Sequence, residues 1–152
     1  MPAEARFREC AASLRAASDR TNLGLSGPAL ARVLLSLERP SDAEALLEDF
    51  RDNRVMPAAR ANGLSIAAVI AARRGDITEA LRLSAEADAL VAPTDCLIDQ
   101  GDIALDRAEV LLLGGRPADA RAAAGDALAR FERKEHAIGI RRAREFLAAL
   151  PE

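Results

Sequence analysis

The chain has 152 residues, half of them hydrophobic, which is enough apolar surface for the core of one domain. Aromatic residues make up 3% with no Trp and no Tyr, and the formal net charge is −3, so neither a stacking surface nor a basic field favours nucleic acid as a partner. Two cysteines without short spacing, no signal-peptide pattern and no apolar run of membrane-spanning length predict a cytoplasmic protein with free thiols.

Eight helices are expected in chain order, because apolar residues recur at helical spacing and no stretch alternates as a strand does. Turn and capping residues set the boundaries: Ser26-Gly27-Pro28 is expected to start the second helix, Ser41 to cap the third, and Thr94 or Asp95 the sixth. The expected ranges are 3–19, 26–37, 41–53, 57–74, 77–90, 95–113, 117–134 and 137–150.

Three helix–corner–helix stretches repeat along the chain. Aligned on their corners, they place Ala43, Ala80 and Ala120 at one site, 37 and 40 residues apart, and another alanine stands twelve residues before each. Small residues at both sites allow helices to approach closely. The pattern predicts an all-α fold, an antiparallel helix-hairpin solenoid that forms a single domain over residues 1–152.

The two ends of the repeat are unpaired in this phasing. The first helix is the second half of a hairpin, and the eighth is a first half, so at least one end is expected to expose apolar surface. For the first helix we expect Phe7 and Leu14 to be either partly exposed or covered by a second copy of the chain, which would make a homodimer.

The repeated alanines, with Gly75 and Gly115 five residues before the second one, resemble tetratricopeptide repeats. Glu38 departs from that glycine, and Ile77 and Pro117 stand where the family has a bulky aromatic residue. The resemblance implies a helical solenoid that binds partners on its concave side.

A narrower resemblance covers residues 85–150, including TDCLIDQGDIALDRAEVLLLGGRPADA. This segment is similar to the helical C-terminal tails of large actinobacterial regulators that couple a signal-transduction ATPase to a nucleotide cyclase or a DNA-binding domain. The resemblance implies a sensing or partner-binding surface, with the ATPase upstream. The chain is then either a piece of such a regulator or a separate protein built from the same repeats.

Catalytic patterns are weak. His136 is the single histidine and lies at a helix junction, where a cation near a helix C-terminus is mildly favoured. A Gly-rich loop ending in Gly-Lys-Ser/Thr is absent from the sequence, and the basic residues between Arg130 and Arg144 are interleaved with acids. We therefore expect no enzyme, no cofactor, no metal and no direct nucleic-acid or membrane partner.

The sixth helix carries an acidic row: Asp95, Asp99, Asp102, Asp106 and Glu109. At about 100° per residue these side chains share one face. One interpretation is an exposed row neutralised by Arg141, Arg142 or Arg144 of the last helix. The other is an acidic strip in the groove of the solenoid that receives a basic or polar peptide.

Aligning the repeats selects the groove residues. In a tetratricopeptide-like solenoid the first helix of each hairpin lines the concave side, and the residues that follow the first aligned alanines are Arg32, Val69 and Glu109. On this basis the predicted partner-binding residues are Asn62, Arg73, Asp102, Asp106 and Glu109.

The function expected from the sequence is a protein- or peptide-binding module, the sensing part of a bacterial signalling or transcription regulator. Two alternatives remain open: a stand-alone adaptor, and a small-molecule-sensing domain with an apolar pocket between hairpins.

Overall fold

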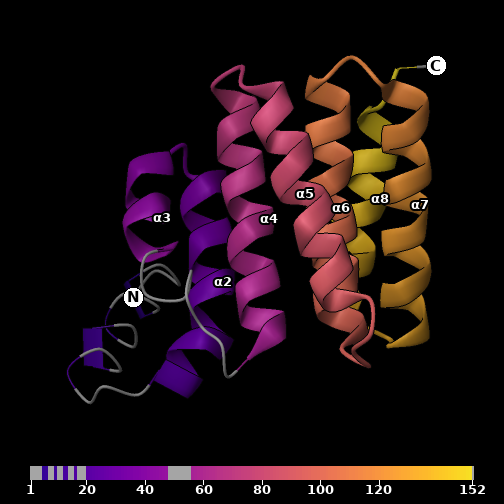
Figure 1. The fold of residues 1–152 in the computed structure, drawn as a ribbon. Helices are drawn as coiled ribbons and strands as arrows, with labels where there is room; N and C mark the ends of the chain where they lie inside the picture. The colour runs from indigo at the N-terminus through magenta and orange to yellow at the C-terminus, as the bar shows by residue number, and fades with distance from the viewer. Residues whose placement is uncertain are drawn as a thin grey trace.

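The computed structural model describes residues 5–6, 9, 12–13, 16, 20–47 and 56–151, and for residues 20–25 the backbone alone. Every regular element in this part of the chain is an α-helix, and the helices pack in adjacent pairs (Figure 1). They are α2 (Arg20–Ser36), α3 (Pro40–Leu47), α4 (Pro57–Arg73), α5 (Ile77–Val91), α6 (Leu97–Leu113), α7 (Pro117–Arg133) and α8 (Ala137–Ala149).

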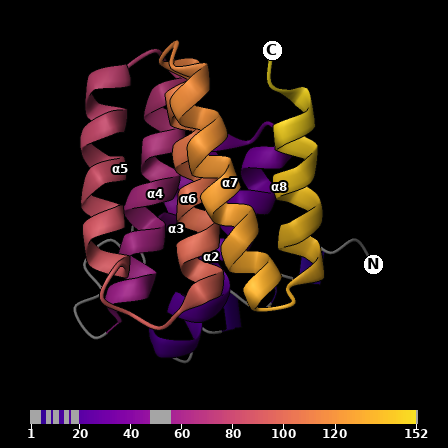
Figure 2. The ribbon, with the colours of Figure 1, turned by 90° about the vertical axis from the view of Figure 1, so that its right-hand side faces the viewer.

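The helices form two layers. Three hairpins, α2/α3, α4/α5 and α6/α7, follow one another, and α2, α4, α6 and α8 are consecutive neighbours in one layer. Viewed from the side, α5 and α8 stand at opposite sides of the molecule with α4, α6 and α7 between them (Figure 2). No described helix is long and apolar enough to cross a membrane.

Close helix packing at the repeated alanines is confirmed. All six alanines of the two aligned sites are at most 1% exposed: Ala31, Ala43, Ala68, Ala80, Ala108 and Ala120. Because no side chain larger than a methyl group intervenes there, the two helices of a hairpin and the neighbouring hairpins come into direct contact.

Four of the described corners, α2/α3, α4/α5, α6/α7 and α7/α8, share one backbone geometry. Gly75 and Gly115 have positive φ angles of 88° and 74°, and Glu38 and Glu135 adopt the same left-handed region at 55° and 57°. At each corner the next residue's N–H donates to a carbonyl five residues earlier, as in a Schellman turn: Arg39 to Leu34, Asp76 to Ala71, Arg116 to Leu111 and His136 to Phe131. Glu38 thus makes the turn that a glycine makes in the other repeats.

Three predicted helix starts are wrong. Helix α2 begins at Arg20, before the expected cap at Ser26, and runs through Pro28. A proline inside a helix removes one hydrogen bond and crowds the carbonyl four residues earlier. Gly27 and Pro28 are both buried, so tertiary packing offsets this cost and the helix continues across them. Helix α3 begins at Pro40 rather than after a Ser41 cap, because proline suits the first helical turn.

The third correction concerns α6, whose N-cap residue is Cys96, two residues beyond Thr94. The Thr94 hydroxyl instead donates to the carbonyl of Val91 at 2.7 Å, which ties it to the end of α5. Asp95, an expected member of the acidic row, is exposed and lies before the helix.

Expectations for the first helix lie mostly outside the described residues. Six single residues described before residue 17 are helical, whereas Phe7, Leu14 and the expected end of the third helix at residue 53 are not among those described. At the other end, α8 buries Gly139 and Ala143, and its one exposed large apolar side chain is Ile138.

Candidate partner-binding groove

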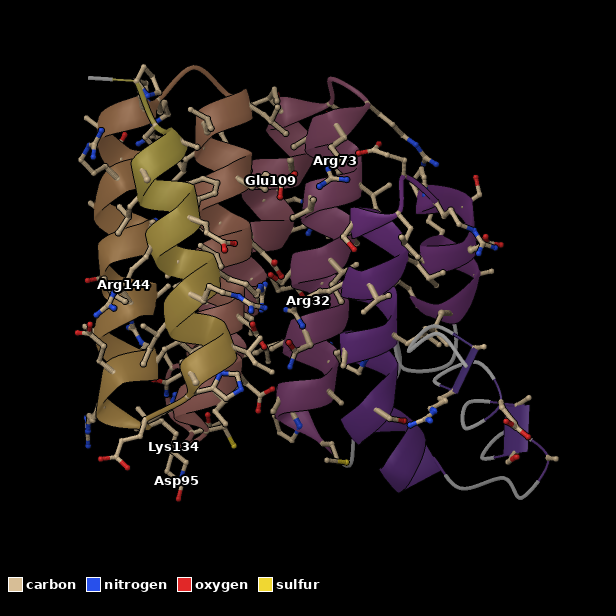
Figure 3. All side chains as sticks on the ribbon, turned by 180° about the vertical axis from the view of Figure 1, so that it is seen from behind. Arg32, Arg73, Asp95, Glu109, Lys134 and Arg144 are labelled. Atoms are coloured by element: carbon tan, nitrogen blue, oxygen red, sulfur yellow. The ribbon has the colours of Figure 1, made fainter. Side chains whose placement is uncertain are left out.

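A groove of about 640 Å³ runs along the layer formed by α2, α4, α6 and α8. Helices α2 and α8 form its walls, and α4 and α6 form its floor. The charged lining side chains are Arg32 from α2, Arg73 from α4, Asp99, Asp102, Asp106 and Glu109 from α6, and Arg142 from α8. Figure 3 shows Arg32, Arg73 and Glu109 in the space between α8 and α2.

Arg32 and Asp106 form the centre of this site. The Arg32 guanidinium donates from Nη2 and Nε to Asp106 Oδ2 at 2.7 and 3.2 Å, and the Ser65 hydroxyl donates to the same oxygen at 2.9 Å. Asp106 is 8% exposed. Two charges this deep are stabilised only because they are paired and hydrogen-bonded.

Burial alone would lower the pKa of Arg32, but Asp106, Asp102 and Asp99 nearby together outweigh it and raise the pKa above its ordinary value. A group with a raised folded-state pKa contributes stability below its unfolded pKa and loses it only as pH rises through the folded value. Arg32 therefore stays charged at every ordinary working pH.

Asn62 lies beneath the groove at 2% exposure and joins two of its charged groups. Its Oδ1 accepts from Arg32 Nη2 at 2.9 Å, while its Nδ2 donates to Asp99 Oδ1 at 2.7 Å and to the carbonyl of Ala58 at 2.9 Å. The Asn62 amide thus uses both its oxygen and its nitrogen, which fixes its orientation.

Two further pairs lie closer to solvent. Arg73 Nε donates to Glu109 Oε1 at 2.7 Å and Nη1 to the carbonyl of Leu35 at 3.1 Å, so this arginine connects α4 to both α6 and α2. Burial lowers the pKa of Arg73, but the hydrogen bond and negative charge of Glu109, together with the charges of Glu38 and Asp106, outweigh it, so the net shift is upward. Arg142 Nη1 donates to Asp102 Oδ1 at 2.6 Å across the α8 side of the groove.

The structure brings the five predicted residues together. Arg73, Asp102, Asp106 and Glu109 line the groove and Asn62 supports it from below, while their role in binding stays a prediction. Each expected interpretation of the acidic row describes part of the structure, since the row lines a groove and Arg142 also pairs with it. Arg141 and Arg144, the other arginines considered, pair instead with Glu145 and Glu132.

Arg32 and Ser65 are absent from the predicted set, although both contact Asp106. For Arg32 a signal was present: it occupies the same repeat position as Val69 and Glu109, and all three line the groove. For Ser65 the sequence holds no such signal, because a serine inside an apolar helix is common.

His136 has a different environment from the one expected. It is the N-cap residue of α8, and its Nδ1 accepts from the Gly139 N–H at 3.2 Å. The ring nitrogen thus satisfies one of the free N–H groups at the start of α8. The ring also packs beside Phe131, with centroids 5.6 Å apart.

Comparisons of the chain with protein families, with curated proteins and with solved structures found no match. Within the described residues there is also no group of three or more His, Cys, Asp or Glu side chains able to hold a metal ion.

Proposed function

We propose that this chain is a tetratricopeptide-like α-solenoid that binds a protein or peptide partner in the groove between α2 and α8. The alternation of two helix layers and the buried alanines at both repeat sites support the solenoid part of the proposal. The observation that carries the binding part is the groove itself, about 640 Å³ in volume and lined with charged groups from four helices.

Pre-organisation is the physical reason to expect binding there. Arg32, Asp106 and Asn62 hold one another through hydrogen bonds, so their conformations are already fixed before any partner arrives. A partner then does not have to pay the conformational entropy of ordering these side chains, which is a large cost of association.

A blocking substitution tests the proposal. Ala29 is exposed and lines the groove from α2, and it takes no part in the charged network. Ala29→Trp should fill the groove, and we expect it to weaken the best binder from a randomised peptide library by at least about tenfold, equivalent to about 1.4 kcal/mol.

Ala85→Trp is the matched control, because Ala85 is an exposed helical alanine on α5, away from the groove lining. Both variants should retain the helical circular dichroism signal and a cooperative melt. Equal affinity of the two variants, or no library peptide that binds the unmodified protein, would refute the groove as the partner site.

The biological setting proposed for this module is the helical tail of a cytoplasmic bacterial regulator, which rests on the resemblance of residues 85–150 described above. A small-molecule sensor is less well supported. A hollow between α5, α6 and α7, lined in part by Val91, Ala104 and Ala123, measures about 200 Å³. Ligand pockets commonly occupy about 300–1,000 Å³.

A further inference from the structure

We infer that the groove binds an extended peptide segment and that a lysine or arginine side chain of this segment pairs with Asp99. This inference rests on the proposed function and specifies the chemistry of the partner. It depends on the charge balance of the groove, on the unused polar atoms of its lining and on the length of its floor.

The charges of the lining do not cancel. Four carboxylates and three guanidinium groups line the groove, which leaves one excess negative charge. Asp102, Asp106 and Glu109 each pair with one arginine. Asp99 is the remaining acid, and its hydrogen-bond partner among the described residues is the neutral amide of Asn62.

The position of Asp99 suits a cationic side chain. Asp99 is half-buried, and Ile98 and Ile138 line the same end of the groove, the latter 59% exposed. A carboxylate in partly apolar surroundings interacts more strongly with a cation than one in bulk water. The aliphatic stem of a lysine or arginine can also cover apolar side chains while its charged end reaches the acid.

The polar atoms left over in the groove match a peptide main chain. Among the described residues, Asp102 and Glu109 each accept from an arginine through one oxygen, and Arg142 donates through Nη1 alone. The groove thus offers both acceptors and donors. An extended segment has free N–H and C=O groups that need both, whereas a helix satisfies these groups internally.

The dimensions agree with a short segment. The distance along α6 from Asp99 to Glu109 is about 15 Å at the rise of an α-helix. An extended chain covers this distance with about five residues. One basic residue near the Asp99 end, followed by about four residues toward Glu109, therefore spans the floor.

The experiment uses a randomised library of nine-residue peptides with acetylated and amidated ends, so that terminal charges play no part. We expect lysine and arginine to be enriched over aspartate and glutamate among peptides retained by the protein. The best basic peptide and its Lys→Gln or Arg→Gln counterpart are then measured by fluorescence anisotropy against four proteins: unmodified, Asp99→Asn, Asp95→Asn and Ala29→Trp.

Asp99→Asn removes the charge but keeps an oxygen that can accept from Asn62, so the fold should be unchanged. We expect this variant to bind the basic peptide about tenfold more weakly, in line with loss of one charged hydrogen bond, and to bind the glutamine peptide as the unmodified protein does. Asp95→Asn, which changes the net charge equally at an exposed site outside the groove lining, should change neither affinity.

Each result has a distinct meaning. If peptides bind and Ala29→Trp blocks them, but acidic peptides are enriched or Asp99→Asn behaves like Asp95→Asn, the inference is wrong and the proposed function stands. Helical circular dichroism induced in the bound peptide would also overturn the inference. If no peptide binds, or Ala29→Trp has no effect on binding, the proposed function fails and the inference fails with it.

Discussion

Phe131 provides the most direct test of how closely the C-terminal helices pack. Its ring is fully buried and lies against two glycines, Gly101 of α6 and Gly139 of α8. A Cβ atom added at Gly101 would lie 2.6 Å from Cε1, 2.8 Å from Cζ and 2.9 Å from Cδ1 of Phe131. All three distances are too short for carbon atoms in van der Waals contact, so either the ring or α6 must shift.

The expected effect of Gly101→Ala is a net loss of about 1–2 kcal/mol in the free energy of unfolding. Overpacking a well-packed core costs about 1–3 kcal/mol, and we use the upper half because three atoms of an enclosed ring are involved. The better helix propensity of alanine offsets about 1 kcal/mol of this cost.

Urea denaturation followed by circular dichroism measures the change, and Gly125→Ala is the control. Gly125 is a solvent-exposed residue in the middle of α7, and a Cβ atom added there would meet no atom within 4 Å. It should therefore gain stability, by about 0.5–1 kcal/mol. If Gly101→Ala were as stable as Gly125→Ala, the close contact between Phe131 and α6 would be refuted.

Three further predictions address the repeats, a corner and the groove. Ala120→Leu should overpack the α6/α7 hairpin and lower the free energy of unfolding by about 1–3 kcal/mol. The same substitution at the exposed Ala122 should change the free energy of unfolding little. An unchanged melting temperature for Ala120→Leu would contradict the alignment of the repeats. Glu135→Gly should stabilise the protein by about 0.5–1 kcal/mol in thermal melts, because relief of the left-handed strain exceeds the added entropy of the unfolded chain. Arg32→Met should lower the free energy of unfolding by about 3–5 kcal/mol, because it leaves Asp106 buried without its charged partner. In urea titrations the double variant Arg32→Met with Asp106→Leu should regain most of this stability. Equal stability of the single and double variants would show that the pair is not coupled.

Local sequence signals predicted most of the fold because they act within one helical turn. The corners at Gly75 and Gly115 and the prolines that begin α4 and α7 set the helix bounds from position 57 onward to within one residue, apart from the start of α6, which is two residues later than expected. The alanine spacing predicted which positions are buried because small residues at hairpin contacts are a direct packing requirement.

Signals failed where tertiary packing overrides them. The Ser26-Gly27-Pro28 stretch predicted a helix start, yet α2 begins at Arg20 and runs through it. At Glu38 the sequence shows no glycine, and yet the residue adopts a φ of 55°, because the packed hairpin requires the same reversal of direction as in the other repeats.

The sequence predicted that the acids of the candidate site share one face of a helix, but it did not predict the network of arginine pairs that they form. Helical spacing alone placed the acids of α6 on one side. Their partners depend on how distant helices are arranged, since Arg32 is 74 residues from Asp106 and Arg142 is 40 residues from Asp102. Periodicity within one helix holds no information on such distances. The repeat alignment gave an indication at Arg32, and the arginines of the last helix considered as partners included Arg142 but did not single it out.

How deeply each acid is buried determines whether a substitution there reports on partner binding or on the stability of the fold. Asp106 is almost fully buried and supports Arg32, so reversing its charge would place a second cation beside that arginine and destabilise the fold whether or not a partner binds. Loss of binding in Asp102→Lys with Asp106→Lys would therefore follow from either interpretation of the acidic row. Asp99 is different, because its partner is an amide and an asparagine there preserves the hydrogen bond. Among the acids that line the groove, Asp99 is thus the one that forms no ion pair with a described residue, and its charge is available to a partner.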